Sequence, residues 1–207
     1  MTIVPAAARN RVLLLLGALA VGMAAVGWWA SRRPPASLPE KPLAELIKVE
    51  GRFVLRNDTN QPFTGWVTER YASGGLRSRT AVADGRLHGV SEGWHTNGVR
   101  QVEEHFEGGV SEGLVRKWHG NGVKLSEGTA RAGKFEGVFR RWHPNGVLAE
   151  EVNLVAGEPE GVARSWFPSG SLKAEVTLKS GQVVTQKFWK DGERVPEPVL
   201  AKTEQTP

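Results

Sequence analysis

The chain has 207 residues, a net charge of +5 and no cysteine. The absence of cysteine excludes disulfide scaffolds, thiolate metal sites and cysteine nucleophiles. The mild positive charge gives no argument for nucleic-acid binding. The composition also excludes a polytopic membrane protein and a mainly disordered chain.

An uncharged apolar run, VLLLLGALAVGMAAVGWWA, covers residues 12–30 between two pairs of arginines. As a helix it spans about 28 Å, close to the hydrocarbon thickness of a bilayer. Trp28 and Trp29 stand where an interfacial aromatic belt would lie. We therefore expect residues 1–30 to hold a retained transmembrane helix, with the rest of the protein on the periplasmic or extracellular side. A cleaved signal sequence, giving a secreted protein, is the alternative, although Trp28 is bulky for its distance from a cut after Ala30.

Two further segments differ in composition from the centre of the chain. Residues 31–50 begin with SRRPPASLPEKP and predict an extended, proline-rich linker, in which residues 43–50 could form one short helix. Residues 194–207 show no hydrophobic periodicity and predict a disordered tail. A folded domain is therefore expected at residues 51–193.

That central region repeats every 24 residues. Five series share one register, and together they indicate a repeat protein. They are Gly65, Gly89, Gly113, Gly137 and Gly161; Gly85, Gly109, Gly133, Gly157 and Gly181; Trp94, Trp118, Trp142 and Trp166; Gly98, Gly122, Gly146 and Gly170; and Glu103, Glu127, Glu151 and Glu175. The first unit is slipped by one residue, with Tyr71 in the tryptophan position, and the last unit is truncated.

Each unit has the pattern of a β-hairpin. The pairs Asn97-Gly98, Asn121-Gly122 and Asn145-Gly146 predict two-residue type I′ turns, which need positive φ at both central residues, and Gly170 holds the fourth turn. Gly108-Gly109 predicts the turn back to the next unit. No helical spacing follows residue 50, so we expect an all-β fold, an elongated antiparallel meander of about twelve strands.

The turn positions also predict which residues face each other across the hairpins. They place Arg116 opposite Glu127, Arg140 opposite Glu151 and Arg164 opposite Glu175, pairs that stabilise a hairpin by about 0.2–1 kcal/mol each. The second unit differs, because Glu92 would face Glu103. Alternation along the strands puts each tryptophan on the face of these pairs, and the histidine that follows it on the other face.

The repeating unit G-x-x-x-x-W-x-x-N-G-x-x-x-x-E, followed by Gly-x-x-x-Gly, resembles the variant MORN repeat. The segment from Pro62 to Gly65, with Tyr71, Gly75 and Leu76 after it, is similar to the opening of bacterial YwqK family antitoxins of toxin–antitoxin systems. The resemblance covers about residues 52–192. It implies an elongated antiparallel sheet and a non-enzymatic role in binding or neutralising a protein partner such as a toxin.

Candidate chemical motifs are few. Two G-x-S-x-G matches, at 89–93 and 109–113, fall at repeat turns without the helix that a hydrolase nucleophile elbow requires. His95, His119 and His143 would lie two strands, about 9–10 Å, apart, which is too far for two of them to share one zinc ion. We therefore expect no catalytic residues, no cofactor and no metal.

The tryptophan and arginine series allow two interpretations. The tryptophans pack along a single-layer sheet that has no second layer to cover it, or they form an aromatic groove for an extended partner, with the arginines as further anchors. The candidate partner-binding residues are Trp94, Arg116, Trp118, Arg140, Trp142, Arg164 and Trp166. The glutamate partners of the arginines argue against nucleic acid.

These observations favour a monomeric, membrane-tethered repeat protein that binds a protein partner. An antitoxin-like or immunity-like role is its most specific form. The alternative is a structural module of the cell envelope whose sheet lies against anionic lipid, because MORN repeats have been associated with membranes. The matched arginines and glutamates argue against that alternative, since a lipid-facing sheet should show unmatched basic residues.

Overall fold

A computed structural model describes residues 38–193. The predicted transmembrane helix at 12–30 and the tail at 194–207 lie outside the described residues. The described part is all-β apart from one short 3-10 helix, η1 (Leu43–Glu45). It contains no helix that is long and apolar enough to cross a membrane.

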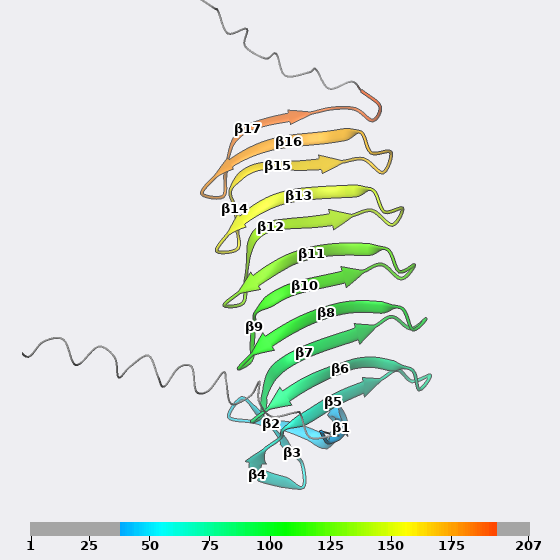
Figure 1. Ribbon diagram of the computed structural model, residues 1–207, viewed down its shortest axis with the longest axis vertical. Coiled ribbons are helices and arrows are strands. Elements are labelled where there is room, and N and C mark those ends of the chain that lie inside the picture. Colours follow the sequence, from blue (N-terminus) through cyan, green and yellow to red (C-terminus); the bar gives the residue numbers. More distant parts are fainter. Residues whose placement is uncertain (1–37, 194–207) are drawn as a thin grey trace, which may run out of the picture. The chain divides into compact units, whose positions relative to one another are not determined.

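Most strands belong to one fourteen-stranded sheet, which Figure 1 shows as a ladder in a single layer. In their order across the sheet its main strands are β1 (Glu40–Pro42), β5 (Gly65–Arg70), β6 (Leu76–Ala83), β7 (Arg86–Trp94), β8 (Arg100–Glu107), β10 (Gly113–Trp118), β11 (Lys124–Arg131), β12 (Lys134–Trp142), β13 (Leu148–Val155), β15 (Gly161–Trp166), β16 (Leu172–Lys179) and β17 (Gln182–Phe188). Two short strands lie off this path: β9 (Val110–Ser111) pairs with β8, and β14 (Glu158–Pro159) pairs with β13.

The order from β5 to β17 follows the sequence, so the expected antiparallel meander is confirmed. The start of the fold differs from the expectation. Residues 40–49, which the composition placed in the linker, form β1, η1 and β2 (Leu46–Val49). The expected short helix at 43–50 is only the single turn η1, because strand β2 pairs with β3 (Arg52–Leu55) directly after it.

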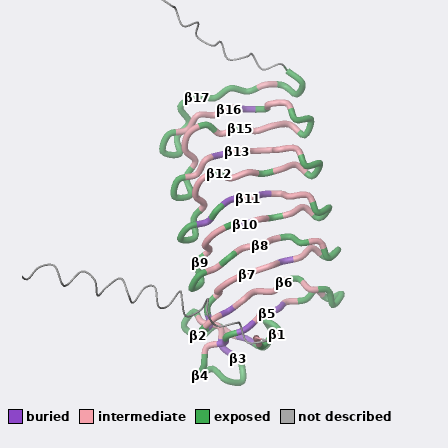
Figure 2. The backbone as a smooth tube through the Cα atoms, in the orientation of Figure 1, coloured by how far each residue is buried: buried purple, intermediate pink, exposed green. Residues whose placement is uncertain are grey.

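A second sheet packs against the first strands of the large one. It consists of β2, β3 and β4 (Asp58–Pro62). Its Leu46 joins Phe63, Val67 and Val82 in a buried cluster. Beyond β7 the buried positions of the large sheet are scattered, as Figure 2 shows, and include Val115, Ala130, Val152 and Ala174. Most of the repeat region therefore holds its shape without a conventional core.

The turns after the tryptophans differ from the prediction. The N–H of His143 donates to the carbonyl of Val147 at 2.8 Å, and the N–H of Gly146 donates to the carbonyl of His143 at 2.9 Å. Gly146 has a φ of +86°, whereas Asn145 does not adopt positive φ. The loop is therefore a three-residue turn that ends in a left-handed glycine, and the predicted type I′ turn at Asn-Gly is wrong. The same bonds recur around Asn97 and Asn121.

The asparagines explain this difference, because their side chains have other partners. Oδ1 of Asn145 accepts a hydrogen bond from the N–H of Val147 at 3.2 Å, an Asx turn that suits the right-handed conformation. Two-residue turns with positive φ at both positions lie at the opposite ends of the strands. One example is Ala132-Gly133, with φ of 48° and 78°, between the paired residues Arg131 and Lys134.

The predicted cross-strand pairs are nevertheless confirmed. Trp142 lies opposite Leu148 and Arg141 lies opposite Glu150, so Ala149 is passed over in the pairing. This one-residue shift offsets the extra residue of the longer turn, and Arg140 faces Glu151 as expected. The equivalent shift occurs beside each of the other three repeat tryptophans.

The turn geometry predicts opposite effects for two neighbouring glycines. Gly122 has a φ of +86°, so Gly122→Ala should lower the free energy of unfolding by about 1 kcal/mol or more. Gly120 lies two residues earlier, where the next two units have Pro144 and Pro168. Gly120→Pro should therefore raise the free energy of unfolding by about 0.4–1 kcal/mol. Urea denaturation of the two variants measures both; equal effects on stability would contradict the assigned turn.

Candidate partner-binding surface

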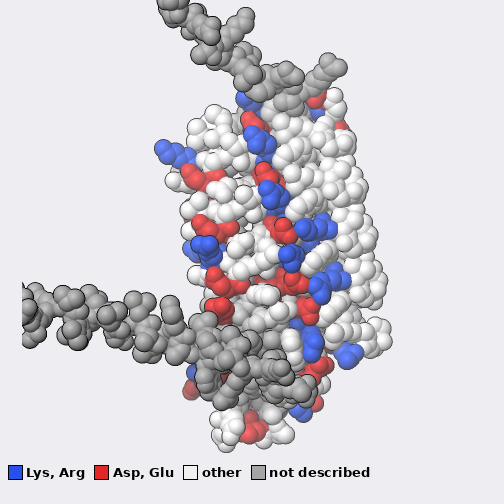
Figure 3. Space-filling view, in the orientation of Figure 1, with Lys and Arg blue, Asp and Glu red and all other residues white. Residues whose placement is uncertain are grey.

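One row of charged residues crosses ten strands of the large sheet, each residue directly opposite the next. The row runs Arg79, Glu92, Glu103, Arg116, Glu127, Arg140, Glu151, Arg164, Glu175 and Lys187. Figure 3 shows it as a stripe of alternating basic and acidic residues down one face. We call it the charged row. From Glu103 onward its signs alternate without a break, so each glutamate after Glu103 lies opposite a cation on both neighbouring strands.

Arg116 donates hydrogen bonds to the glutamates on both neighbouring strands of the charged row. Its Nη1 donates to Glu103 at 3.1 Å and its Nε donates to Glu127 at 3.2 Å. Lys124 adds a second bond to Glu127 at 2.8 Å. The bond from Lys124, and then that from Arg116, holds the pKa of the Glu127 carboxyl below its ordinary value.

Arg140 and Arg164 are more open. Arg140 donates through Nε to Glu151 at 2.7 Å, and Arg164 donates through Nε to Glu175 at 2.9 Å. The two arginine side chains are 44% and 45% exposed. Their Nη groups donate no hydrogen bond to any residue in the described range. They are therefore free to bind an acceptor on another molecule.

The like-charged pair Glu92 and Glu103 is present, as the sequence predicted. Arg100 resolves the repulsion, because it donates to Glu92 at 2.7 Å and also to Glu103. The 24-residue series of glycines, tryptophans and glutamates do not single out this residue. The equivalent position one repeat later holds Lys124, another cation, so a charge comparison at that position could have found it.

The tryptophans lie beside the charged row and are half-buried. The guanidinium of Arg100 lies 5.8 Å from the ring centre of Trp118, and Nζ of Lys124 lies 5.0 Å from that of Trp142. Each of these cations also binds a glutamate of the charged row, and so links the row to the tryptophan of the next unit. Trp94 and Trp166, at the ends of β7 and β15, are half-buried as well. The rings thus both pack along the sheet and keep part of their surface open.

Side chains that follow the tryptophans join successive hairpins at the ends of the strands where the three-residue turns lie. Nε2 of His119 donates to the carbonyl of Trp142 at 2.9 Å, and His95 and His143 make the same bond to the next unit. Nδ2 of Asn121 donates to the carbonyl of Pro144 at 2.8 Å. These side chains have a structural role in stacking the hairpins.

A corresponding series of glutamates lies at the other ends of the strands, beside the two-residue turns. The sequence patterns did not identify it. Glu112, Glu136 and Glu160 are 24 residues apart, and each accepts a hydrogen bond from a backbone N–H in the turn of the following hairpin, at 2.6–2.8 Å. The regular spacing was a usable signal. The glutamates of the charged row share the same 24-residue spacing.

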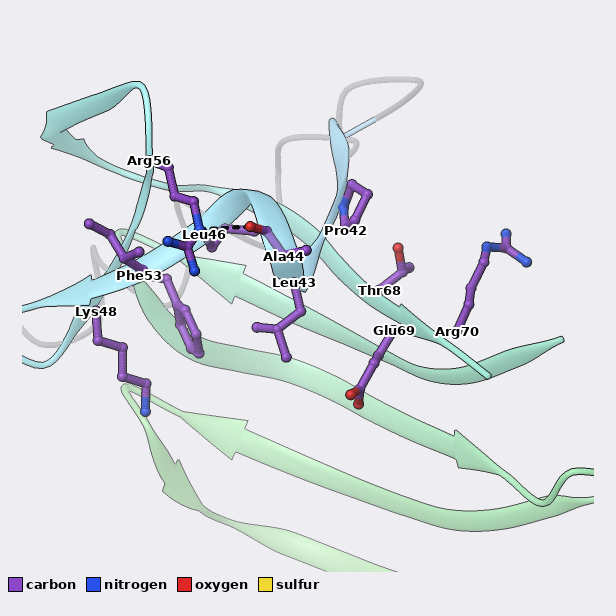
Figure 4. Close-up of a pocket in the computed structure, with 11 residues that line it drawn as sticks. Pro42, Leu43, Ala44, Leu46, Lys48, Phe53, Arg56, Thr68, Glu69 and Arg70 are labelled. Atoms are coloured by element: carbon purple, nitrogen blue, oxygen red, sulfur yellow. Dashed lines mark hydrogen bonds between the residues drawn. The ribbon is translucent and has the colours of Figure 1, made fainter. Parts of the chain in front are cut away.

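Two other features give no indication of chemistry. Ser91, in the first G-x-S-x-G match, shares a hydrogen bond of 2.8 Å with the hydroxyl of Thr80. A pocket of about 570 Å³ lies between η1, the small sheet and β5 (Figure 4). Two of its cations bind backbone carbonyls: Arg56 binds Ala44 at 2.7 Å and Arg70 binds Gly74 at 3.0 Å.

Comparison with known proteins supports the repeat assignment. A family model described as the MORN repeat variant matches residues 135–155 and 159–180. The matched segments contain the hairpin β12–β13 and strands β15 and β16 with the turn between them. The chain therefore contains MORN repeat variants at these positions. No curated protein matches the chain.

The charge network predicts a dependence of stability on pH. Because folding lowers the pKa of Glu127, its ionised form stabilises the fold above the ordinary carboxyl value of 4.5. This contribution is lost as the pH falls through the lower folded pKa. Urea denaturation between pH 2 and pH 7 should therefore show a smaller acid loss of stability for Glu127→Gln than for wild type.

Glu107 provides a matched control for this experiment. It is an exposed carboxylate of β8, one hairpin earlier, and it makes no ion pair within residues 38–193. Glu107→Gln should keep the wild-type pH dependence. A Glu127→Gln profile that coincides with the Glu107→Gln profile would contradict the role given to Glu127.

Proposed function

We propose that the repeat sheet binds a protein partner through the face that carries the charged row. The centre of the binding surface is Arg116, Trp118, Arg140 and Trp142, with Trp94, Arg164 and Trp166 at its sides. The protein acts by binding and not as an enzyme.

The observation that carries this proposal is the arrangement of three parallel series on one face. Each half-exposed arginine has a half-buried tryptophan two residues after it and an exposed aliphatic residue two residues before it, so all three point to the same side. The aliphatic residues are Leu114, Val138 and Val162, with 36–47% of their surface exposed. Aromatic and arginine anchors beside open apolar surface are typical of protein interfaces. An extended partner would meet the same three groups in each unit.

The most specific form of the proposal is an antitoxin-like or immunity-like protein. It rests on the resemblance of Pro62–Gly65, Tyr71, Gly75 and Leu76 to the opening of YwqK family antitoxins. In the structure Phe63, from this segment, belongs to the buried cluster under the small sheet. The segment thus has a structural role in closing the first end of the repeat array, and the partner would bind elsewhere, on the charged face.

We further propose that residues 12–30 tether this binding module to a membrane. The support is the length of the apolar run, its flanking arginines and the bulky Trp28 near the candidate cleavage position after Ala30. The full-length protein should sediment with membranes and resist extraction by high salt and carbonate. An N-terminal sequence that begins near Ser31 in the mature protein would contradict the tether.

Replacing two arginines tests the binding face. The partner is first captured from the native host with the full-length protein, and its affinity is then measured with wild type and with Arg116→Ala/Arg140→Ala. We expect at least about a tenfold weaker affinity for the double variant, because two interface anchors are lost. Each exposed pair should contribute no more than about 1 kcal/mol to folding, so the variant should remain folded.

The opposite face offers a matched control. Lys117→Ala/Arg141→Ala removes the same charge from the neighbouring positions, whose side chains point to the other side of the same strands. This control should bind the partner as wild type does. If both double variants bind equally well, the charged face is not the site. If the protein instead binds vesicles of anionic lipid, and Arg116→Ala/Arg140→Ala abolishes that binding, the membrane-surface alternative holds.

A further inference from the structure

The last strand of the large sheet leaves one edge open. β17 pairs with β16 on one side, and no strand of the described sheet pairs with its other side, as the final strand in Figure 1 shows. All seven residues of β17 are exposed. Strands with unpaired backbone groups are templates on which another strand can add.

The charged row ends at this edge with a cation. Lys187 lies opposite Glu175, and the alternation of signs that begins at Glu103 would continue with an acidic residue on the next strand. The other face of β17 exposes apolar surface. Phe188 is 67% exposed and lies opposite Ala174, and Val183 is 56% exposed and lies opposite Leu178. The edge therefore presents three groups at once, which are open backbone, one cation on one face and apolar side chains on the other.

The first end of the charged row shows how an added strand closes such an edge. β1 pairs with β5 in parallel and is not part of any hairpin repeat. It carries Glu40, whose Oε2 lies 3.6 Å from Nε of Arg79, the first cation of the row. β5, with Thr68 opposite Arg79, separates β1 from β6, and β1 brings its acidic residue to the terminal cation across β5.

We propose that β17 is a docking edge for an extended antiparallel strand of another protein, which carries an acidic residue opposite Lys187 and apolar residues beside Val183 and Phe188. This inference does not rest on the proposed function of the charged face. A strand that fits would gain backbone hydrogen bonds from the open edge, and its side chains would select it by charge and by apolar contact.

Two other occupants fit less well. A second copy that continued the charged row through its own β17 would place Lys187 against Lys187, and like charges directly opposite are destabilising. The chain's own continuation carries Pro196 and Pro198 shortly after Glu193. Proline has no N–H to donate to a ladder, which argues against that continuation as the occupant.

The test uses a peptide that the sheet itself already accepts beside β17. A fluorescently labelled peptide with the sequence SLKAEVTLKS, residues 171–180, is titrated with the purified full-length protein and followed by fluorescence anisotropy. The matched control peptide carries Glu175→Lys. We expect the acidic peptide to bind about fivefold more tightly or better, since the control replaces an attractive cross-strand pair by a repulsive one.

Protein variants then assign the preference to Lys187. Lys187→Gln should abolish the difference between the peptides, and Lys187→Glu should reverse it, with thermal denaturation showing that both remain folded. Because Lys187→Glu also faces Glu175, the neutral variant keeps the test valid if the reversal destabilises the strand. Peptides N-methylated at alternate residues test the backbone bonds, and one of the two methylation patterns should abolish binding.

Several outcomes would overturn the proposal. Binding of neither peptide would mean that β17 does not accept a further strand, and that Lys187 disfavours strand addition at this edge. Equal binding of both peptides by wild type would remove Lys187 as the selecting group. A dimer of the full-length protein in sedimentation equilibrium that Lys187→Gln changes would assign the edge to a second copy instead.

Discussion

Each strand from β6 to β17 on the main path of the sheet places one charged residue at the same level, and the rest of the repeat architecture depends on this register. A slip of one residue in any strand would move its charge to the opposite face and leave its neighbours unpaired. In most sheets a buried apolar face fixes the register. Here only isolated positions such as Val115 and Val152 are buried beyond β7, so apolar burial specifies the pairing less strongly. Individual exposed ion pairs contribute at most about 1 kcal/mol, but each main strand from β8 to β16 takes part in at least one of them along the row.

The turns at the two ends of the strands strengthen this register through different hydrogen bonds. At one end of the strands His119 and Asn121 donate to carbonyls of the next hairpin. At the other end Glu136 accepts from a backbone N–H of the next hairpin. These bonds satisfy turn groups that a single hairpin would leave to water. Each unit therefore stabilises its neighbour, which is the energetic pattern of a linear repeat array. The charged row occupies the middle of the face, and the tryptophans lie at the strand ends beside the turns.

The sequence predicted the hairpins and the cross-strand pairs because the 24-residue spacing carries that information directly. It failed where one pair of residues suits two turns. Asn145-Gly146 is compatible with a type I′ turn, yet Asn145 makes an Asx bond and also reaches Pro168 of the next turn, a contact that only the stacked hairpins create. Arg100 differs, because both of its carboxylate partners lie in its own hairpin and the cation at the equivalent position, Lys124, was a usable signal. Residues 40–49 were assigned to a linker because a short parallel strand beside a repeat has no periodic signal.

The ends of the array follow a different constraint from its middle. From Glu127 to Glu175 every glutamate of the charged row lies opposite a cation on both neighbouring strands. The repeat itself cannot provide this for an end strand, because an end strand has a neighbouring strand on one side only. At the first end the chain adds β1 with Glu40, and the small sheet covers the adjacent apolar face with Leu46 and its neighbours. At the last end the row reaches Lys187 while Val183 and Phe188 stay open on the other face. The asymmetry between a closed first end and an open last end follows from residues outside the 24-residue pattern, and it gives the sheet a direction that the repeats alone do not have.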